Sequence, residues 1–391
     1  MKVHQPKVRY LTPSPHGYTS LDESTSETPL RLTRRKSNLY QGLSLNYGQY
    51  FNGIREVISR KDYQPLLLAT TRQLGRKVSV ADIEEILIYS EKHGSDYHPA
   101  RIEVIVDGVH SVFVMNVALT DRGRTWVRRE FEVLQHLRSK YHYPFLPHTY
   151  FQGEAFCDTG PGGQGTDSFV MFLADWFQGY HEFHLSMDKE HGGQGLILWD
   201  TEKRYTWLSR SQVREVYLQA ARILTLYYDL ETFEQIFPWH HAAGDFVIKA
   251  QDESIDVRLI TARQYAPMLE PSKGVSVHEA LFLFLLNLSL RMRLDRLDGV
   301  GPVAWADDDC VDATLEGFLA GLRTKEEQGL SKEGFPDLFL QHTRSLTKEA
   351  LSEAFHALID AADQRAPDIP ILKRYCQSHI LKFHTALQSQ K

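Results

Sequence analysis

The segment from His240 to Asp245 holds the densest group of side chains that could do chemistry, with the sequence His-His-Ala-Ala-Gly-Asp. An imidazole can act as a general base, and a carboxylate can orient that base or hold a metal ion. His240 and His241 are adjacent and point in different directions on most backbones, so a metal site here would need a further ligand. The segment therefore predicts a base with a carboxylate partner, a metal site, or a polar cluster whose imidazoles make structural hydrogen bonds.

The same segment fits the His-His-x-x-x-Asp pattern of the condensation-type acyltransferases. That resemblance implies that His241 is the base and that Asp245 is its structural partner. Two features depart from the pattern. Phe246 follows the aspartate where those enzymes usually have glycine, and a helical stretch rather than a strand precedes the motif.

The N-terminal half of the chain contains the elements that would position such a site from one side. Residues 1–42 are rich in Ser, Thr, Pro and charge and predict a flexible arm, and 43–80 predict a helical extension. Asp107-Gly108 joins two β-rich runs and predicts a hairpin. The predicted strands, with a helix at 123–138 after the third, are 86–90, 100–106, 110–119, 149–156 and 168–174.

The C-terminal half is mainly helical. A long helix is predicted over 210–230, followed by two short strands at 246–250 and 257–261. The remaining predicted helices are 276–293, 312–324, 346–363 and 369–386. Strands first and helices afterwards predict an α+β fold.

The order of these elements resembles the protein-kinase-like superfamily, most closely its branch of aminoglycoside phosphotransferases and choline kinases, over about residues 84–300. The run 110–119 looks like the third strand of the small lobe, 128–137 looks like the helix that follows it, and 238–263 resembles the catalytic loop with its strand pair and metal-binding triplet. The resemblance implies a bilobal fold with a five-stranded N-lobe at 81–178 and a helical C-lobe at 179–391. A small-molecule or protein ligand would bind in the cleft between the lobes.

In the N-lobe, the resemblance puts Asn116 where active relatives have a phosphate-binding lysine, and Glu130 where they have the helix glutamate. Asparagine can donate a hydrogen bond but carries no charge. Lys92 or Arg101, at the expected lip of the cleft, could supply the missing positive charge to an anionic ligand.

In the C-lobe, the catalytic aspartate corresponds to His240 and the metal-binding asparagine to Asp245. The aspartate of the metal-binding triplet corresponds to Thr261, which is followed by Ala262 and Arg263. The phosphate lysine, the base and one metal carboxylate are thus replaced, while Asp245 remains a possible metal ligand and Arg263 a possible contact to an anion.

Composition limits the partners that we expect. The net charge of −6 gives no electrostatic footprint for nucleic acid or an anionic membrane. The longest apolar run, 281–290, is about half the length that spans a bilayer. No secretory signal is evident, so we expect a cytoplasmic protein. The three cysteines, Cys157, Cys310 and Cys376, suggest neither a disulfide framework nor a zinc site.

Two functional hypotheses follow. The first is a pseudokinase-type protein that binds a nucleotide, another small anion or a protein partner in the cleft without ordinary kinase activity. The second is a transferase with altered chemistry that uses ATP with Mg²⁺ or Mn²⁺, in which Asp245 holds the metal and His240 or His241 is the base.

Overall fold

A large sheet is formed first along the chain and a mostly helical region follows it, as predicted. The computed structural model describes residues 5–14, 16–30, 45–91, 97–158, 166–188, 193–200, 204–239, 244–271 and 274–390. Helices make up 45% and strands 29% of the structure, with a seven-stranded mixed sheet followed by a mostly helical region, so the α+β prediction is confirmed. Unit 1 comprises residues 1–140 and 147–178, and unit 2 comprises 141–146 and 179–391.

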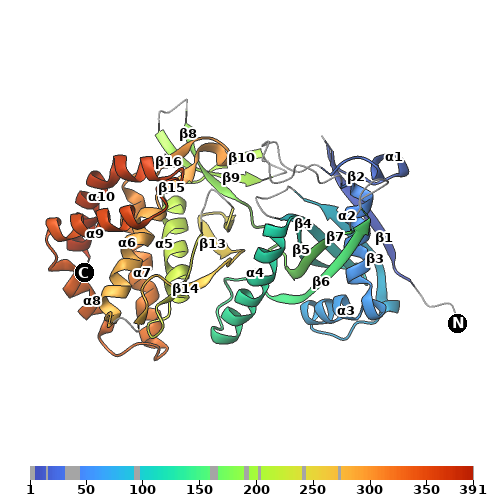
Figure 1. The fold of residues 1–391 in the computed structure, drawn as a ribbon, viewed down its shortest axis with the longest axis horizontal. Coiled ribbons are helices and arrows are strands. Elements are labelled where there is room, and N and C mark those ends of the chain that lie inside the picture. Colours follow the sequence, from blue (N-terminus) through green and yellow to red (C-terminus); the bar gives the residue numbers. More distant parts are fainter. Residues whose placement is uncertain are drawn as a thin grey trace. The chain divides into compact units, whose positions relative to one another are not determined.

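Unit 1 is built on the seven-stranded sheet, in which the strand order is β2-β1-β3-β4-β5-β7-β6 (Figure 1). β1 pairs in parallel with β3, and every other neighbouring pair in the sheet is antiparallel. Its strands are β1 (Lys7–Ser14), β2 (Gly17–Ser20), β3 (Ile83–Ser90), β4 (His98–Val106), β5 (Val109–Ala118), β6 (Thr149–Asp158) and β7 (Thr166–Asp175). Its helices are α1 (Glu23–Ser26), α2 (Tyr47–Ile58), α3 (Arg60–Leu74), the 3-10 turn η2 (Val80–Asp82) and α4 (Asp121–Lys140).

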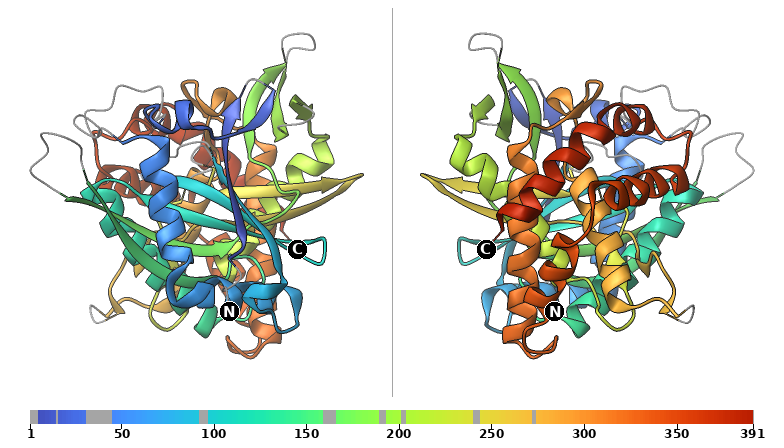
Figure 2. Two further views of the ribbon diagram at one scale, coloured as in Figure 1. Left: turned by 90° about the vertical axis from the view of Figure 1, so that its right-hand side faces the viewer. Right: turned by 90° about the vertical axis from the view of Figure 1, so that its left-hand side faces the viewer.

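Helices cover both faces of this sheet (Figures 1 and 2). On one face, α2 and α3 bury a continuous apolar core that includes Phe113 and Met115 of β5. On the other face, Phe131 of α4 contacts the ring of Phe172 of β7, with 5.8 Å between centroids. Because side chains alternate along a strand, Asn116 of β5 lies on the face that α4 covers.

The structure corrects two predictions for the N-terminal region. The sheet has seven strands rather than five, because β1 and β2 come from the segment predicted to be a flexible arm. Tyr10 of β1 stacks on Phe51 of α2 at 5.0 Å, which anchors that strand to the core. The predicted hairpin at Asp107-Gly108 is confirmed: both residues have positive φ, as a tight turn between β4 and β5 requires.

Unit 2 combines a helical body with short antiparallel sheets. β8 (Phe183–Asp188), β9 (Gly193–Asp200) and β10 (Arg204–Trp207) form a three-stranded sheet that the sequence did not predict. Its other strands pair as β12 (Phe246–Gln251) with β13 (Ser254–Leu259), β11 (Glu234–Ile236) with β14 (Tyr265–Pro267), and β15 (Leu294–Arg296) with β16 (Val303–Trp305). Its helices are α5 (Arg210–Leu226), α6 (Val277–Arg291), the 3-10 turn η5 (Leu297–Gly299), α7 (Asp309–Glu327), α8 (Phe335–Arg344), α9 (Lys348–Ala361) and α10 (Ile369–Ser389).

Two helices of unit 2 run side by side in the same direction. Arg210 of α5 pairs with Asp309 of α7, and near the other end Arg222 of α5 contacts Thr324 of α7. Gly317 lies in the contact, because a Cβ atom there would lie 2.0 Å from the carbonyl oxygen of Leu218. Ser209 begins α5 with a capping box, in which its side chain accepts from the backbone N–H of Gln212.

Candidate functional site

In unit 1, the structure describes three of the site residues predicted from the sequence: Asn116, Glu130 and Arg101. Asn116 lies on β5 between Pro99 of β4 and Phe172 of β7. Glu130 lies on α4, the helix that follows β5, and is only 1% exposed. A buried carboxylate is stable only when donors or cations satisfy it.

Tyr97 supplies one of those donors. Its hydroxyl lies 2.6 Å from a carboxylate oxygen of Glu130, a short hydrogen bond typical of a charged acceptor. Tyr97 directly precedes β4, so the chain segment that leads into that strand reaches α4. The sequence analysis missed Tyr97, because a tyrosine in a polar loop carries no signal of a carboxylate partner 33 residues away.

Arg101 of β4, predicted to contact an anion, is engaged by groups of its own unit. It forms ion pairs with Glu91, at 3.0 Å, and with Glu103. Its guanidinium lies 3.7 Å from the ring centroid of Tyr89, a cation–π contact. Two carboxylates already neutralise this arginine, which weighs against a role as the substitute for the missing lysine.

In unit 2, the hairpin of β12 and β13 brings Asp245 and Arg263 together. Asp245 directly precedes β12, and Phe246 pairs with Leu259 at the end of β13. The N–H of Ile260 donates to the carbonyl of Asp245 at 2.8 Å and extends the ladder by one bond. The hairpin is therefore open at the end where β12 begins and β13 finishes. At this end, the residues after β13 lie beside Asp245.

The side chains of Asp245 and Arg263 form a bidentate ion pair. The distances from Nη1 and Nη2 to the two carboxylate oxygens are 2.8 and 2.6 Å. The carboxylate is 1% exposed and the arginine side chain 21% exposed. The parallel, two-point geometry is the strongest that these groups can form, and it takes up both oxygens of the acid.

A metal ion implied by the family resemblance does not fit this arrangement. Mg²⁺ and Mn²⁺ bind carboxylate oxygens directly, and both oxygens of Asp245 accept from a cation of the chain itself. Thr261, the counterpart of the second metal ligand, is buried and has no carboxylate. Within the described residues, no group of three or more His, Cys, Asp or Glu side chains could hold a metal ion.

Gly244 determines the path of the backbone into Asp245. Its φ is +69°, and a Cβ atom at this position would lie 2.9 Å from Oε1 of Glu182. A side chain would therefore be strained twice, by the left-handed backbone and by the close carboxylate. Lys92, His240 and His241, the other predicted site residues, lie outside the described residues.

A second charged cluster of unit 2 was not predicted. His184 of β8 is 2% exposed, and its ring nitrogens lie 3.4 Å from Asp295 and 3.5 Å from Glu182. Burial alone would lower the pKa of His184, but the two carboxylates outweigh it and raise that pKa to about 9. The cluster joins β8 to β15 across 111 residues of chain, a separation that no local pattern reveals.

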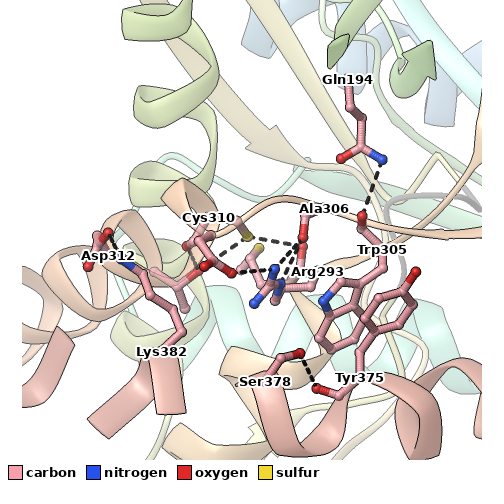
Figure 3. A network of polar contacts seen from close by, with 12 residues as sticks. Gln194, Arg293, Trp305, Ala306, Cys310, Asp312, Tyr375, Ser378 and Lys382 are labelled. Carbon is pink, nitrogen blue, oxygen red and sulfur yellow. Dashed lines mark hydrogen bonds and ion pairs between the residues drawn. The ribbon is translucent and has the colours of Figure 1, made fainter. Parts of the chain in front are cut away.

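Arg293 is the centre of a third polar cluster (Figure 3). Its guanidinium donates to the carbonyl of Ala306 at 2.8 and 2.6 Å and lies 4.7 Å from the ring centroid of Trp305. Trp305 stacks on Tyr375 of α10 at 5.5 Å. Burial raises the pKa of the nearby Cys310 thiol to about 12, so this thiol is not a nucleophile. The cluster joins β16 and α10.

A groove of about 710 Å³ lies elsewhere in unit 2, between β9 and the N-terminal ends of α5 and α7. Its charged walls are largely paired: Arg210 with Asp309 at 2.6 Å, and Asp308 with the buried Arg293 at 2.9 Å. Of the predicted site residues that the structure describes, none lines it. The lining residues are Gln194, Gly195, Leu208, Arg210, Val213, Arg214, Tyr217 and Asp307 to Asp309.

Comparison of the chain with protein-family models and with curated proteins returned no match. Within the described part of the chain, no helix is both long enough and apolar enough to cross a membrane.

Proposed function

We propose that this chain has a protein-kinase-like fold and works as a pseudokinase-type binding protein, without ordinary kinase activity. Its ligand would be a nucleotide, another small anion or a protein partner. The elements that hold a nucleotide in kinase-like proteins, namely the strands of unit 1 and the loop with Asp245 in unit 2, would recognise it.

The arrangement of elements supports the kinase-like part of the proposal. Five consecutive antiparallel strands of unit 1 lie in the order β3-β4-β5-β7-β6, and α4 follows the third of them. In unit 2 a long helix, α5, precedes the strand pair β12 and β13. The resemblance in the sequence was based on the same order of elements: five strands with a helix after the third, then a long helix and a strand pair.

The observation that carries the proposal is the uncharged residue at the strand position, Asn116. In protein kinases the helix glutamate pairs with a strand lysine that contacts the phosphates, and this ion pair must form for activity. Here the strand residue is Asn116, and the phenol of Tyr97 donates to Glu130 at 2.6 Å. The asparagine amide and the tyrosine phenol are both uncharged, so neither offers the phosphates a compensating charge. Phosphoryl transfer depends on that compensation more strongly than binding does, because charge develops on the reacting oxygens in the transition state.

The alternative, an ATP- and metal-dependent transferase, requires a metal ion on Asp245. The ion pair with Arg263 occupies both oxygens of that side chain, which disfavours this alternative. Its proposed bases, His240 and His241, lie outside the described residues.

The experiment that tests the proposal measures binding and turnover in the same samples. Melting temperatures are recorded with ATP, ADP and GTP, each with and without Mg²⁺ or Mn²⁺, while ADP formation from ATP is followed. We expect nucleotides to raise the melting temperature to the same extent with and without metal, because a ligand stabilises the state that it binds. We expect no ADP to form.

Two results would contradict the proposal in different ways. Metal-dependent formation of ADP that Asp245→Ala abolishes would establish the transferase instead. A flat response to every nucleotide would exclude a nucleotide ligand, and capture of a protein partner would then test the remaining form of the proposal.

A further inference from the structure

The open end of the β12–β13 hairpin contains a buried negative charge and a positive charge in direct contact. Asp245 is 1% exposed, and both of its oxygens accept from the guanidinium of Arg263. We infer that Arg263 is a built-in cation that takes the place of a metal ion on Asp245 and makes this loop metal-independent. The analogy with a kinase metal site rests on the proposed function, but the geometry of the pair does not.

A guanidinium and a divalent ion would compete for the same acceptors. Mg²⁺ and Mn²⁺ bind carboxylate oxygens at about 2.0–2.2 Å, and a divalent ion that close to the carboxylate would also lie close to the guanidinium and repel it. Displacement would break the bidentate contact with Asp245 in a site where only 21% of the Arg263 side chain meets solvent. Breaking a largely buried ion pair is strongly unfavourable, which opposes metal binding by the native chain.

Removal of Arg263 would reverse this balance. In Arg263→Ala the largely buried Asp245 carboxylate would lose the guanidinium, and a divalent ion could then enter the space that this group leaves. The inference therefore predicts a latent metal site, closed in the native protein and opened by the loss of one side chain.

The test uses Mn²⁺ alone as the probe, without nucleotide, on the full-length chain. Binding is measured by the loss of the free Mn²⁺ signal in electron paramagnetic resonance, together with the melting temperature. We expect Arg263→Ala to bind Mn²⁺ at least about tenfold more tightly than the native chain and to melt higher when Mn²⁺ is added. The double variant Arg263→Ala/Asp245→Asn should lose both effects.

Arg258→Ala is the matched control. Arg258 lies on β13 of the same hairpin, pairs with Asp256 at 2.5 Å and has a side chain that is 17% exposed, close to the 21% of Arg263. Its removal should create no Mn²⁺ binding. Millimolar guanidinium chloride should compete with Mn²⁺ in Arg263→Ala, because the free ion can occupy the position of the lost side chain.

The inference is overturned if the native chain binds Mn²⁺ and Asp245→Asn abolishes that binding, or if a folded Arg263→Ala binds none. Arg263→Gln, which keeps most of the side-chain volume without the charge, replaces Arg263→Ala if the latter does not fold. Failure of the proposed function can be distinguished from these outcomes. The proposed function is tested by nucleotide binding and ADP formation in the native chain, whereas this inference is tested by Mn²⁺ binding in the absence of nucleotide.

Discussion

Two buried carboxylates are the most informative residues of this chain. Glu130 and Asp245 are each 1% exposed, and each accepts from a donor at hydrogen-bonding distance: Tyr97 for the first and Arg263 for the second. A buried acid loses its hydration, so its partner must replace the lost water. The choice of partner then decides the chemistry: a phenol satisfies a carboxylate without adding charge, whereas a guanidinium neutralises it.

We predict that Tyr97→Phe destabilises the protein by about 1–3 kcal/mol, because it removes a donor from a buried carboxylate. Unfolding in urea at pH 7 measures this loss. Tyr205→Phe, which removes a hydroxyl from a tyrosine that is 63% exposed, is the control and should be neutral. Equal stability of Tyr97→Phe and the native chain would show that the Tyr97 hydroxyl contributes nothing to the burial of Glu130.

At the scale of elements, the parallel contact of α5 and α7 organises the helical body of unit 2. The two helices approach closely only because α7 has glycines at the contact: Gly317 beside Leu218, and Gly321, where a Cβ would lie 2.8 Å from Cβ of Thr225. Glycine is a poor helix former, so its presence in mid-helix indicates that close packing outweighs helix propensity here.

We predict that Gly317→Ala destabilises the protein by about 1–3 kcal/mol or more, although alanine favours the helix by about 1 kcal/mol. The added Cβ would lie 2.0 Å from a backbone oxygen, so α5 and α7 must move apart. Thermal unfolding measures the change. Arg323→Ala, on the exposed side of the same helix, should leave the stability nearly unchanged. A more stable Gly317→Ala would contradict this account of the contact.

At the scale of the whole molecule, His148 of unit 1 and His184 of unit 2 are two described histidines that make stability depend on pH, with opposite signs. In unit 1, burial and the charges of Arg138 and Arg72 lower the pKa of His148 to about 4. In unit 2, Asp295 and Glu182 outweigh the effect of burial and raise the pKa of His184 to about 9. His148 is therefore neutral and His184 charged in the folded chain at neutral pH.

The signs follow from linkage. The unfolded chain takes up a proton at His148 near pH 6.5 and the folded chain only near pH 4, so this stabilisation is lost as the pH falls between those values. The stabilisation from His184 is fully present below pH 6.5 and is lost as the pH rises through about 9. This stabilisation from the buried His184 is on the order of 2 kcal/mol.

We therefore predict that the stabilisation from His148 and the stabilisation from His184 are both near their maximum around pH 6.5. Unfolding in urea between pH 4 and pH 10 measures the profile. His184→Gln should flatten the alkaline side and His148→Gln the acidic side, whereas His356→Gln, at an exposed position, should change neither. If the pH profile of His184→Gln runs parallel to that of the native chain, the result would contradict the assigned charge of His184.

The sequence by itself determined the class of fold and the position of many elements. Local signals sufficed: Asp107-Gly108 specified the β4–β5 hairpin, and short β-rich runs marked β3 to β7 of unit 1. It also singled out Asp245, Glu130 and Arg263. Their identities could be compared with a known motif, and that comparison needs no knowledge of distances.

Only the tertiary structure decided what these residues contact. The N-terminal segment looked disordered by composition, yet β1 gains the sheet edge of β3 and the ring of Phe51, contacts that lie far along the chain. In the same way, Arg263 was assigned as a contact to an anion, whereas the hairpin places it on Asp245. Pairing between residues distant in sequence depends on the packing of whole elements, and a pattern along the chain does not contain it.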